Sequence, residues 1–287
     1  MIDKALSDVL CDKLDIRTLH WKPVYGGSIN SCFALQTEKS VFFCKINNAT
    51  KFPHLFEFEQ KGLELIGRQH IIATPQVIES FESNNHQFLI LEWIKEGERT
   101  KAFWENFGKQ LAQLHHVSHN AFGLDHFNYI GAIAQDNEWL ADWNSFFIQK
   151  RIIPLVKQCY DLHLLDHGHL GSFQVLYKRI ADLFERSPAA LLHGDLWSGN
   201  FMCNEKQQPI FIDPAVYFGH RSMDLGMTTL FGGFDKAFYE AYHYHYPLPP
   251  QHQAQWAVCN LYPLLIHLLL FGKTYLSSIE STLQEFQ

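Results

Sequence analysis

The sequence predicts an α+β protein of two lobes, a small lobe built on an antiparallel sheet and a larger, mainly helical lobe. The first ninety of the 287 residues contain short β-rich runs separated by glycine and polar turns, which are typical of an antiparallel meander. The rest of the chain has mostly helical periodicity. We therefore expect one domain over residues 1–92 and a second over residues 93–287.

The first domain is expected to contain two helices and five strands. Helical spacing of apolar residues predicts helices over residues 4–14 and 56–67. Runs rich in β-branched and aromatic residues, each bounded by Gly, Pro or polar residues, predict the strands. These strands are expected over residues 20–24, 32–37, 41–46, 71–80 and 87–93.

The second domain is expected to be built from helices. One apolar stripe marks a helix over residues 101–116: Phe103, Phe107, Leu111 and Leu114. Further helices are expected over residues 138–161, 170–186, 234–246 and 254–281. The most apolar run, residues 261–271, contains Pro263 and is too short to cross a bilayer, so it is expected to lie in the core.

Composition limits the classes of partner. The net charge is −7, so no basic excess offsets phosphate repulsion, and we expect neither nucleic acid nor a membrane surface as a partner. The six cysteines lie far apart without a C-x-x-C pair, which is typical of a reducing compartment. The first residues lack the pattern of a signal peptide, and we expect a cytoplasmic protein. The oligomeric state and any redox role of Cys32 stay open.

One motif indicates chemistry. His193-Gly194-Asp195 is followed by Asn200, five residues after the Asp, and by Asp213 at the end of an apolar run. This is how protein-kinase-like folds present a catalytic base and two metal ligands. We predict that Asp195 accepts the proton of a substrate hydroxyl group, and that Asn200 and Asp213 hold the Mg²⁺ that neutralises the phosphates of ATP. The structural alternative is an ordinary turn at 193–195 with Asp213 capping a strand.

A second set of residues would bind the nucleotide. The loop Gly26-Gly27-Ser28-Ile29-Asn30 lies between two expected strands, and its glycines let backbone N–H groups approach phosphates. It is not a Walker A loop, and a simple hairpin turn is the alternative. Lys45 interrupts an apolar strand, where it would contact the phosphates while paired with Glu57 or Glu59. An edge-strand lysine that opposes aggregation is the alternative.

Three further segments support the same site. The run Glu92-Trp93-Ile94 lies where the two lobes would join, and its backbone is expected to read the adenine edge. Asp224 would either hydrogen-bond the backbone of the 193–195 turn or cap a helix. Trp197 would either stack on the substrate or belong to the core. His193 and His220 are kept as substrate-binding or supporting candidates.

Longer strings resemble one known family. The segments LLHGDLWSGN, FIDPAVYFGHRSMDLGMTTLFGGF, FGLDHFNYIGAIAQDNEWLADWNSFFIQKRI and NLYPLLIHLLLFGKTY are similar to those of the fructosamine kinase (ketosamine-3-kinase) family. That family belongs to the aminoglycoside-phosphotransferase branch of the protein-kinase-like fold. The resemblance runs from about residue 25 to residue 275. It departs in the phosphate loop, which has two consecutive glycines where many relatives have three, and Ser28 where some have cysteine.

The resemblance implies ATP- and Mg²⁺-dependent phosphorylation of the sugar 3-hydroxyl group of ketosamines, the adducts of lysine with sugars. The 3-phosphate then decomposes and regenerates the amine. The resemblance also implies that Glu59, rather than Glu57, pairs with Lys45, because the family's Phe-x-x-Glu-x-x-Gly-Leu run aligns with residues 56–63. It assigns Asp195 as proton acceptor, Asn200 and Asp213 as Mg²⁺ ligands, and residues 92–94 as the adenine-reading linker.

Two other functions stay open at this stage. One is a kinase of the same fold that acts on an aminoglycoside, choline or a sugar. The other is a non-catalytic nucleotide-binding protein. The sequence does not distinguish among ketosamines, because one carbon in a pocket contributes only about 1–3 kcal/mol of discrimination. Nor does it distinguish a free amino-acid adduct from a glycated protein.

Overall fold

The computed structural model describes residues 4–25 and 29–286. The chain divides into two compact units. The first comprises the residues up to Glu98 together with Met202–Asp213, and the second comprises Arg99–Phe201 and the residues from Pro214 onward. The first unit therefore combines the N-terminal part of the chain with a short segment about a hundred residues further along the sequence.

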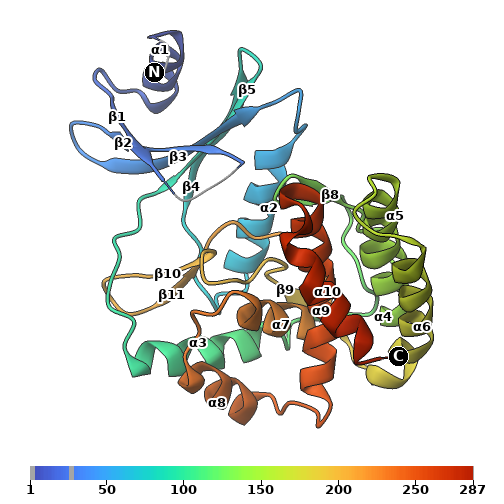
Figure 1. The fold of residues 1–287 in the computed structure, drawn as a ribbon. Coiled ribbons are helices and arrows are strands. Elements are labelled where there is room, and N and C mark those ends of the chain that lie inside the picture. Colours follow the sequence, from blue (N-terminus) through green and yellow to red (C-terminus); the bar gives the residue numbers. More distant parts are fainter. Residues whose placement is uncertain (1–3, 26–28, 287) are drawn as a thin grey trace. The chain divides into compact units, whose positions relative to one another are not determined.

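The first unit is built on a five-stranded sheet in which all neighbouring strands are antiparallel (Figure 1). The strands are β1 (His20–Val24), β2 (Ser31–Gln36), β3 (Val41–Asn48), β4 (Val77–Ser83) and β5 (His86–Glu92), in the order β1-β2-β3-β5-β4. Helix α1 (Lys4–Leu14) contributes Leu10 to a buried cluster with Leu35, Cys44 and Phe88. Alternate residues of the strands thus form the core of this unit.

Two further elements belong to the first unit. Helix α2 (Leu55–Gly67) packs beside β4 and β5. The hairpin β10 (Phe201–Cys203) and β11 (Pro209–Phe211) is attached at both of its strands. The N–H of Gly97 donates to the carbonyl O of Cys203 at 2.7 Å, and the N–H of Phe211 donates to that of Ala73 at 2.9 Å. These bonds place Asp213, which follows β11, in the first unit.

The second unit is mainly helical. Its helices are α3 (Lys101–Leu114), α4 (Trp143–Phe146), the π-helical η1 (Phe147–Ile152), α5 (Ile153–Asp161), α6 (His167–Leu183), α7 (Ser222–Leu230), α8 (Lys236–His245), α9 (His252–Phe271), the 3₁₀ turn η2 (Lys273–Tyr275) and α10 (Leu276–Gln284). Its short strands are β6 (Ser118–His119), β7 (Asn128–Ile130), β8 (Ile133–Gln135), β9 (Ala189–Leu192) and β12 (Tyr217–Gly219). Strand β9 lies between β12 and β6, and β7 pairs with β8.

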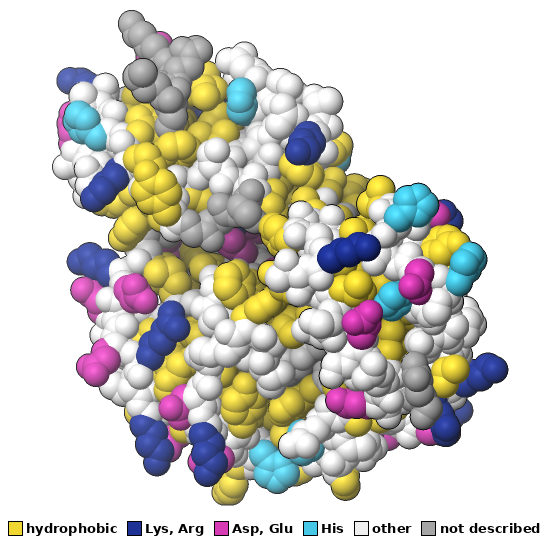
Figure 2. All heavy atoms as spheres, viewed as in Figure 1, with side chains coloured by type: hydrophobic (Ala, Val, Ile, Leu, Met, Phe, Trp, Pro, Cys, Tyr) yellow, Lys and Arg dark blue, Asp and Glu magenta, His cyan; other side chains and the backbone are white. Residues whose placement is uncertain are grey.

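Helix α9 forms the core of the second unit. By length and composition it is the one helix in the described part of the chain that could cross a membrane, and 61% of its most apolar window is buried inside the protein. It packs against α5, α7 and α10. Burial of this kind is typical of a core helix. On the surface, Lys and Arg are interspersed with Asp and Glu over the face shown in Figure 2.

The structure confirms the α+β fold class, with an antiparallel sheet in the first unit and a mainly helical second unit, and it corrects three expected elements. The strand expected from residue 71 begins at Val77, because Pro75 has no N–H to donate to a ladder. The helix expected over 138–161 begins at Trp143, after the cap Asp142, and contains the π-helical turn η1. The helix expected over 254–281 is two helices, because Gly272 adopts φ +82° and ends α9.

Candidate active site

The turn at 193–195 follows the buried strand β9. Gly194 has φ +82°, and a Cβ atom there would lie 2.0 Å from the carbonyl O of Ala215. Only glycine fits both this backbone conformation and this close approach. The N–H of Ala215 donates to the carbonyl O of His193 at 2.8 Å. The turn that presents Asp195 is therefore fixed to the segment that follows Asp213 in sequence.

Asp224 lies beneath this turn, at the first turn of α7. Its side chain is 1% exposed, and it accepts hydrogen bonds from the N–H of His193 (2.8 Å) and the N–H of Gly194 (2.9 Å). Helix α7 has Arg221 at its N-cap position, so Asp224 is not the cap. Of the two alternatives for Asp224, the structure shows the first: its side chain hydrogen-bonds the backbone of the 193–195 turn.

The support continues through two residues that sequence reasoning missed. His115 Nε2 lies 3.3 Å from Asp224 Oδ2, and His115 Nδ1 lies 2.8 Å from the hydroxyl of Tyr242. Burial lowers the pKa of His115 more than Asp224 raises it, so the ring is neutral. We assign the proton to Nε2, which then donates to the carboxylate. No sequence signal separates His115 from the other sixteen histidines.

Asn200 lies against the candidate base. Its Nδ2 donates to Asp195 Oδ2 and to the main-chain O of Asp195, both at 2.9 Å. The first bond orients the Asp195 carboxylate, and the second ties Asn200 to the main chain of the turn. They also use the amide nitrogen of Asn200, which leaves its Oδ1 as the atom suited to a cation.

Trp197 is half-buried and begins a line of rings. It lies 6.0 Å from the ring of Phe231, which lies 4.9 Å from the ring of His267. Phe231 is 39% exposed. His267 Nδ1 lies 2.7 Å from the carbonyl O of Pro263, so the ring carries its proton on Nδ1 and offers Nε2 as an acceptor. These rings belong to the same unit as Asp195, and the sequence had singled out only Trp197.

The first unit brings together Lys45, Glu59 and Asp213. Lys45 Nζ lies 2.6 Å from Glu59 Oε1 and 2.6 Å from Asp213 Oδ1, and the lysine is 2% exposed. Glu57 instead pairs with Lys61 on the surface. Burial alone would lower the pKa of Lys45, but the charges of Asp213 and Glu59 raise it overall, so the ammonium group persists. Burial raises the pKa of Glu59 to about 7, against the opposing charge of Lys45.

The surroundings of this triad include the other predicted nucleotide residues. Asp213 adopts φ +55°, a conformation that Asp tolerates better than most residues, and its side chain is 41% exposed. Asn47 Nδ2 donates to Asn30 Oδ1 at 2.6 Å and so ties the end of the predicted phosphate loop to β3. Gly26, Gly27 and Ser28 lie outside the described residues.

The predicted linker over residues 92–94 begins as β5 ends. The N–H of Glu92 donates to the carbonyl O of Gln76 at 2.9 Å. Trp93 is 36% exposed and its ring lies 6.4 Å from that of Phe43.

Cys32 faces Lys45 across the β2–β3 strand pair, and burial raises the pKa of its thiol to about 11 despite the nearby ammonium group. The Cys32 thiol is therefore protonated near neutral pH.

His220 packs between two rings instead of reaching solvent. It is 1% exposed and lies 5.7 Å from Trp143 and 4.9 Å from Phe184, ring to ring. Burial, reinforced by Arg221 and His115, lowers its pKa to about 3. The structure therefore makes His220 a neutral core residue.

This burial predicts a pH dependence of stability. The His220 side chain takes up a proton below pH 6.5 in the unfolded chain, but only near pH 3 in the folded protein. The free energy of unfolding therefore falls as the pH falls from 6.5 toward 3. The loss from this residue is about 2 kcal/mol between pH 7 and pH 5. Urea unfolding of wild type and His220→Gln at both pH values measures it. We expect a smaller loss in the variant, and an equal loss would contradict the assignment.

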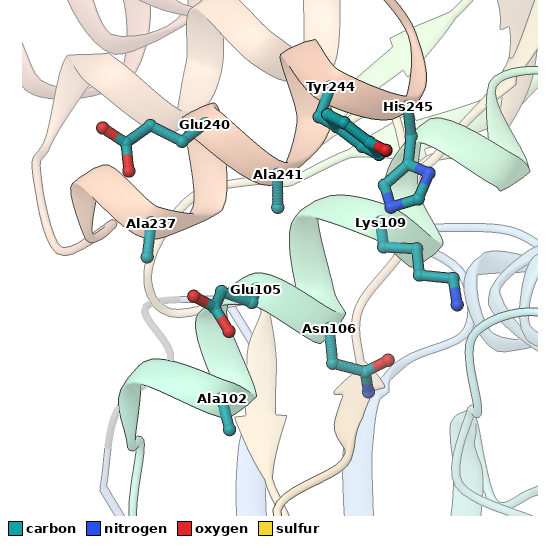
Figure 3. Close-up of a pocket in the computed structure, with 9 residues that line it drawn as sticks. All are labelled: Ala102, Glu105, Asn106, Lys109, Ala237, Glu240, Ala241, Tyr244 and His245. Carbon is teal, nitrogen blue, oxygen red and sulfur yellow. The ribbon is translucent and has the colours of Figure 1, made fainter.

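One groove in the described part of the chain lies away from these residues. A groove of about 420 Å³ lies between α3 and α8 (Figure 3). Its lining includes Glu105, Lys109 and Glu240, but none of the candidate residues. Within residues 4–25 and 29–286, no cluster of three or more His, Cys, Asp or Glu side chains is placed to hold a metal ion. The candidate chemistry therefore concentrates at the 193–200 segment and at the Lys45 triad.

Comparisons with known proteins show which family this chain belongs to. A family model described as fructosamine kinase matches residues 1–287. The chain is 37% identical to a probable ketoamine kinase of Lactiplantibacillus plantarum, over 92% of this chain and 93% of that protein. It is 33% identical to the chloroplastic protein-ribulosamine 3-kinase of Arabidopsis thaliana, over 92% of this chain and 81% of that protein.

Solved structures show the same relationship at the level of the fold. The crystal structure of a putative fructosamine-3-kinase from Haemophilus somnus matches with a TM-score of 0.87 at 25% identity, over 98% of this chain and 96% of that one. The aminoglycoside phosphotransferase APH(4)-Ia matches with a TM-score of 0.64 at 12% identity, over 99% of both chains. The second likeness extends only to the fold.

Proposed function

Because the chain belongs to the fructosamine kinase family and is a kinase that phosphorylates a sugar hydroxyl group, we propose that it transfers the γ-phosphoryl group of ATP to the 3-hydroxyl group of a lysine ketosamine. The 33% identity to a ribulosamine 3-kinase favours a ketosamine as the acceptor. The product would be a sugar 3-phosphate that decomposes and releases the amine. We place this deglycation reaction in the cytoplasm.

The observation that carries the proposal is the geometry of the 193–200 segment. Asp195 lies on a tight turn that requires Gly194. The carboxylate of Asp224 accepts hydrogen bonds from the backbone of this turn, and Asn200 donates one to the Asp195 carboxylate. A carboxylate held in this way serves as an acceptor for the proton of a hydroxyl group. Phosphoryl transfer depends mainly on alignment and charge neutralisation, so a fixed base is what the reaction requires.

The Lys45 triad supports the nucleotide half of the proposal. A buried ammonium group held by two carboxylates is a fixed positive charge, and we assign it to the phosphates of ATP. Glu59 keeps Lys45 oriented from α2. Asp213 is bound to Lys45 through Oδ1 and is partly exposed, so its carboxylate is accessible to a cation.

The donor atoms of Asp213 and Asn200 are of the kind that Mg²⁺ binds. Magnesium prefers oxygen ligands and is usually held by one or two carboxylates together with substrate phosphates, which agrees with Asp213 and the Oδ1 of Asn200. When bound, the ion would neutralise charge on the phosphoryl oxygens. Asn200 would at the same time keep Asp195 oriented through its Nδ2.

Asp213→Ala is expected to weaken Mg²⁺-dependent ATP binding by at least about tenfold, because it removes the one carboxylate in the predicted ligand pair. Isothermal titration with ATP, with and without Mg²⁺, measures the effect. The Lys45–Glu59 ion pair remains in this variant, so binding of ATP without metal should change little. Equal affinity of wild type and variant for Mg·ATP would count against the metal role.

The rings near the base support a sugar as the acceptor. Aromatic faces pack against the C–H faces of sugars, and the free Nε2 of His267 accepts from a hydroxyl group. Trp197 lies two residues from Asp195, so the line Trp197–Phe231–His267 starts beside the base. We assign this line to recognition of the sugar.

A panel of acceptors tests the proposal. ADP release from Mg·ATP would be measured with ribuloselysine, fructoselysine, an aminoglycoside and choline. We expect turnover with one or both ketosamines, and their ranking identifies the preferred sugar. Turnover only with choline or the aminoglycoside would overturn the acceptor while leaving the kinase chemistry in place.

A further inference from the structure

Four rings at the C-terminal end of α9 form a cluster that the proposed sugar line uses only in part. His267 lies at its centre, with its ring 4.9 Å from that of Phe231, 5.4 Å from that of Phe271 and 4.9 Å from that of Tyr275. The rings of Phe271 and Tyr275 lie 6.3 Å from each other. We call these four residues the aromatic box.

The end of α9 brings the box together. Phe271 follows His267 by four residues, so both lie on one face of the helix. In a continuous helix His267 and Tyr275 would lie about 12 Å apart along the axis. They meet because Gly272 adopts φ +82° and ends α9, and the chain turns back into η2. A glycine that stops the helix therefore places the fourth ring.

The box is attached to the segment that carries the candidate base. Gly233 approaches Ser198 so closely that a Cβ atom on the glycine would lie 2.6 Å from the Cβ of Ser198. Phe231, two residues before Gly233, lies 6.0 Å from the ring of Trp197. All of these residues belong to the second unit. The box thus begins one ring contact from Trp197, which follows Asp195 by two residues.

The rings of the box are open to a ligand. Phe231 is 39% exposed, Phe271 is 52% exposed and Tyr275 is half-buried. Phenylalanines of the core, such as Phe103 and Phe107, are 0% exposed. A contiguous patch of exposed apolar side chains is typical of a binding surface, whereas single exposed side chains are common everywhere. The exposure of the box therefore indicates a ligand.

The box presents negative potential without a formal charge. The faces of Phe and Tyr rings carry the negative part of the ring quadrupole and attract cations. His267 Nδ1 donates to the carbonyl O of Pro263 at 2.7 Å, so Nε2 presents a lone pair. Burial lowers the pKa of His267 against the opposing effect of that bond, so the ring is neutral near neutral pH. The charged residue of η2, Lys273, is exposed, so water and salt screen its charge.

A ketosamine carries a group that such a box binds. Its lysine nitrogen is a secondary amine on carbon 1 of the sugar, and amines of this kind are protonated near neutral pH. The nitrogen lies about 5 Å from the 3-hydroxyl oxygen, at single-bond lengths of about 1.5 Å. This length is close to one ring contact in the line from Trp197 to Phe231 and His267. A sugar that lies along this line from Asp195 therefore places its nitrogen at the box.

We propose that the aromatic box binds the secondary ammonium group of the ketosamine, against the faces of Phe271 and Tyr275, and so distinguishes an amine-bearing sugar from a sugar alone. The inference rests on the proposed ketosamine kinase activity, because it concerns the same acceptor. Phe231 and His267 belong to both the sugar line and the box. Choline and aminoglycosides also carry ammonium groups, so the box selects the cation and the sugar line selects the carbon skeleton.

A matched pair of acceptors tests the role of the charge. The amine 1-butylamino-1-deoxyribulose and the ether 1-O-butylribulose carry an ammonium group or an oxygen at the same position. We expect kcat/KM of the wild-type enzyme to be about tenfold higher for the amine, the size of effect that a cation gains from two ring faces. Equal values for the two acceptors would overturn the proposal. This comparison depends on no variant.

Three variants locate the effect. Phe271→Leu and Tyr275→Leu each replace a ring with an apolar side chain, and we expect each to lower kcat/KM for the amine by about threefold, with little change for the ether. In the double variant the two acceptors should agree within about twofold, while KM for ATP stays within about twofold of wild type. Phe127→Leu is the control, because Phe127 is 43% exposed and lies outside the box. It should keep the wild-type ratio of amine to ether.

Equal losses for the amine and the ether in the box variants would also overturn the proposal, because they would indicate apolar packing alone. If the wild-type enzyme phosphorylates neither sugar but does phosphorylate choline, the proposed ketosamine acceptor fails. The box is then tested with choline and its uncharged isostere 3,3-dimethylbutanol in the same variants. If no acceptor is phosphorylated, isothermal titration of the amine and the ether gives the ratio from dissociation constants. In either case, a ratio that the box variants leave unchanged overturns the role of the box.

Discussion

Asp195→Asn is expected to lower kcat by about 10³-fold while the affinity for Mg·ATP stays within a few fold, because the substitution removes the proton acceptor without changing its size. Asn200 donates one hydrogen bond to the side chain of Asp195 and one to its main-chain O, and Asp224 holds the turn, so the backbone should remain in place. Steady-state kinetics with a ketosamine, together with titration of Mg·ATP, measure the two effects separately.

Asn200 provides a check on this prediction. An amide at position 195 presents either an oxygen or an NH₂ group to Asn200 Nδ2, so a loss of orientation would raise the KM for the acceptor as well. A fall in kcat at unchanged KM indicates lost chemistry. An Asp195→Asn enzyme that retains more than about a tenth of wild-type kcat would remove Asp195 from the mechanism.

Lys45→Met is expected to lower kcat/KM for ATP by at least about 10²-fold, because it removes the fixed positive charge assigned to the phosphates. The change also leaves Glu59 and Asp213 without their shared ammonium group. Glu59 is largely buried, so the variant should also lose stability. Kinetics and thermal unfolding of the same sample measure both effects.

The double variant Lys45→Met with Glu59→Gln separates stability from chemistry. It replaces the buried ion pair with neutral groups of similar size, which often restores stability. We expect the thermal midpoint to rise toward that of wild type while kcat/KM for ATP stays low. Recovery of activity together with stability would mean that Lys45 acts only as a structural residue.

Much of the fold followed from local pattern. The alternation of β2, β3 and β5 and the apolar stripe of α3 are periodic over enough residues to be read without tertiary context. The hairpin of residues 201–211 was not predicted, because its strands have three residues each and its attachment to Gly97 and Ala73 is long-range. Strands this short depend on the segments that hold them, and Gly97 and Ala73 lie more than a hundred residues before their partners Cys203 and Phe211.

The sequence predicts candidate site residues only where their spacing along the chain follows a known pattern. Asp195, Asn200 and Asp213 have a fixed order along the chain, and that order predicted them. For Lys45, the residues alone left Glu57 and Glu59 open, because only the rotation of α2 decides which one faces β3. The structure pairs Lys45 with Glu59.

The supporting residues were harder to predict because their partners come from separate helices. One of the two alternatives given for Asp224, hydrogen bonds to the backbone of the 193–195 turn, was correct. Its further partners, His115 and Tyr242, lie on α3 and α8, and neither helix carries a pattern that marks them.

Identification of the phosphorylated product tests the central claim most directly. After incubation of the enzyme with Mg·ATP and ribuloselysine, ¹H–³¹P correlation NMR determines which sugar carbon carries the phosphate. We predict a phosphate on the oxygen of carbon 3, followed by release of free lysine as the product decomposes. Phosphate on any other oxygen, or a stable product that retains its lysine, would contradict the assignment of this protein as a ketosamine 3-kinase.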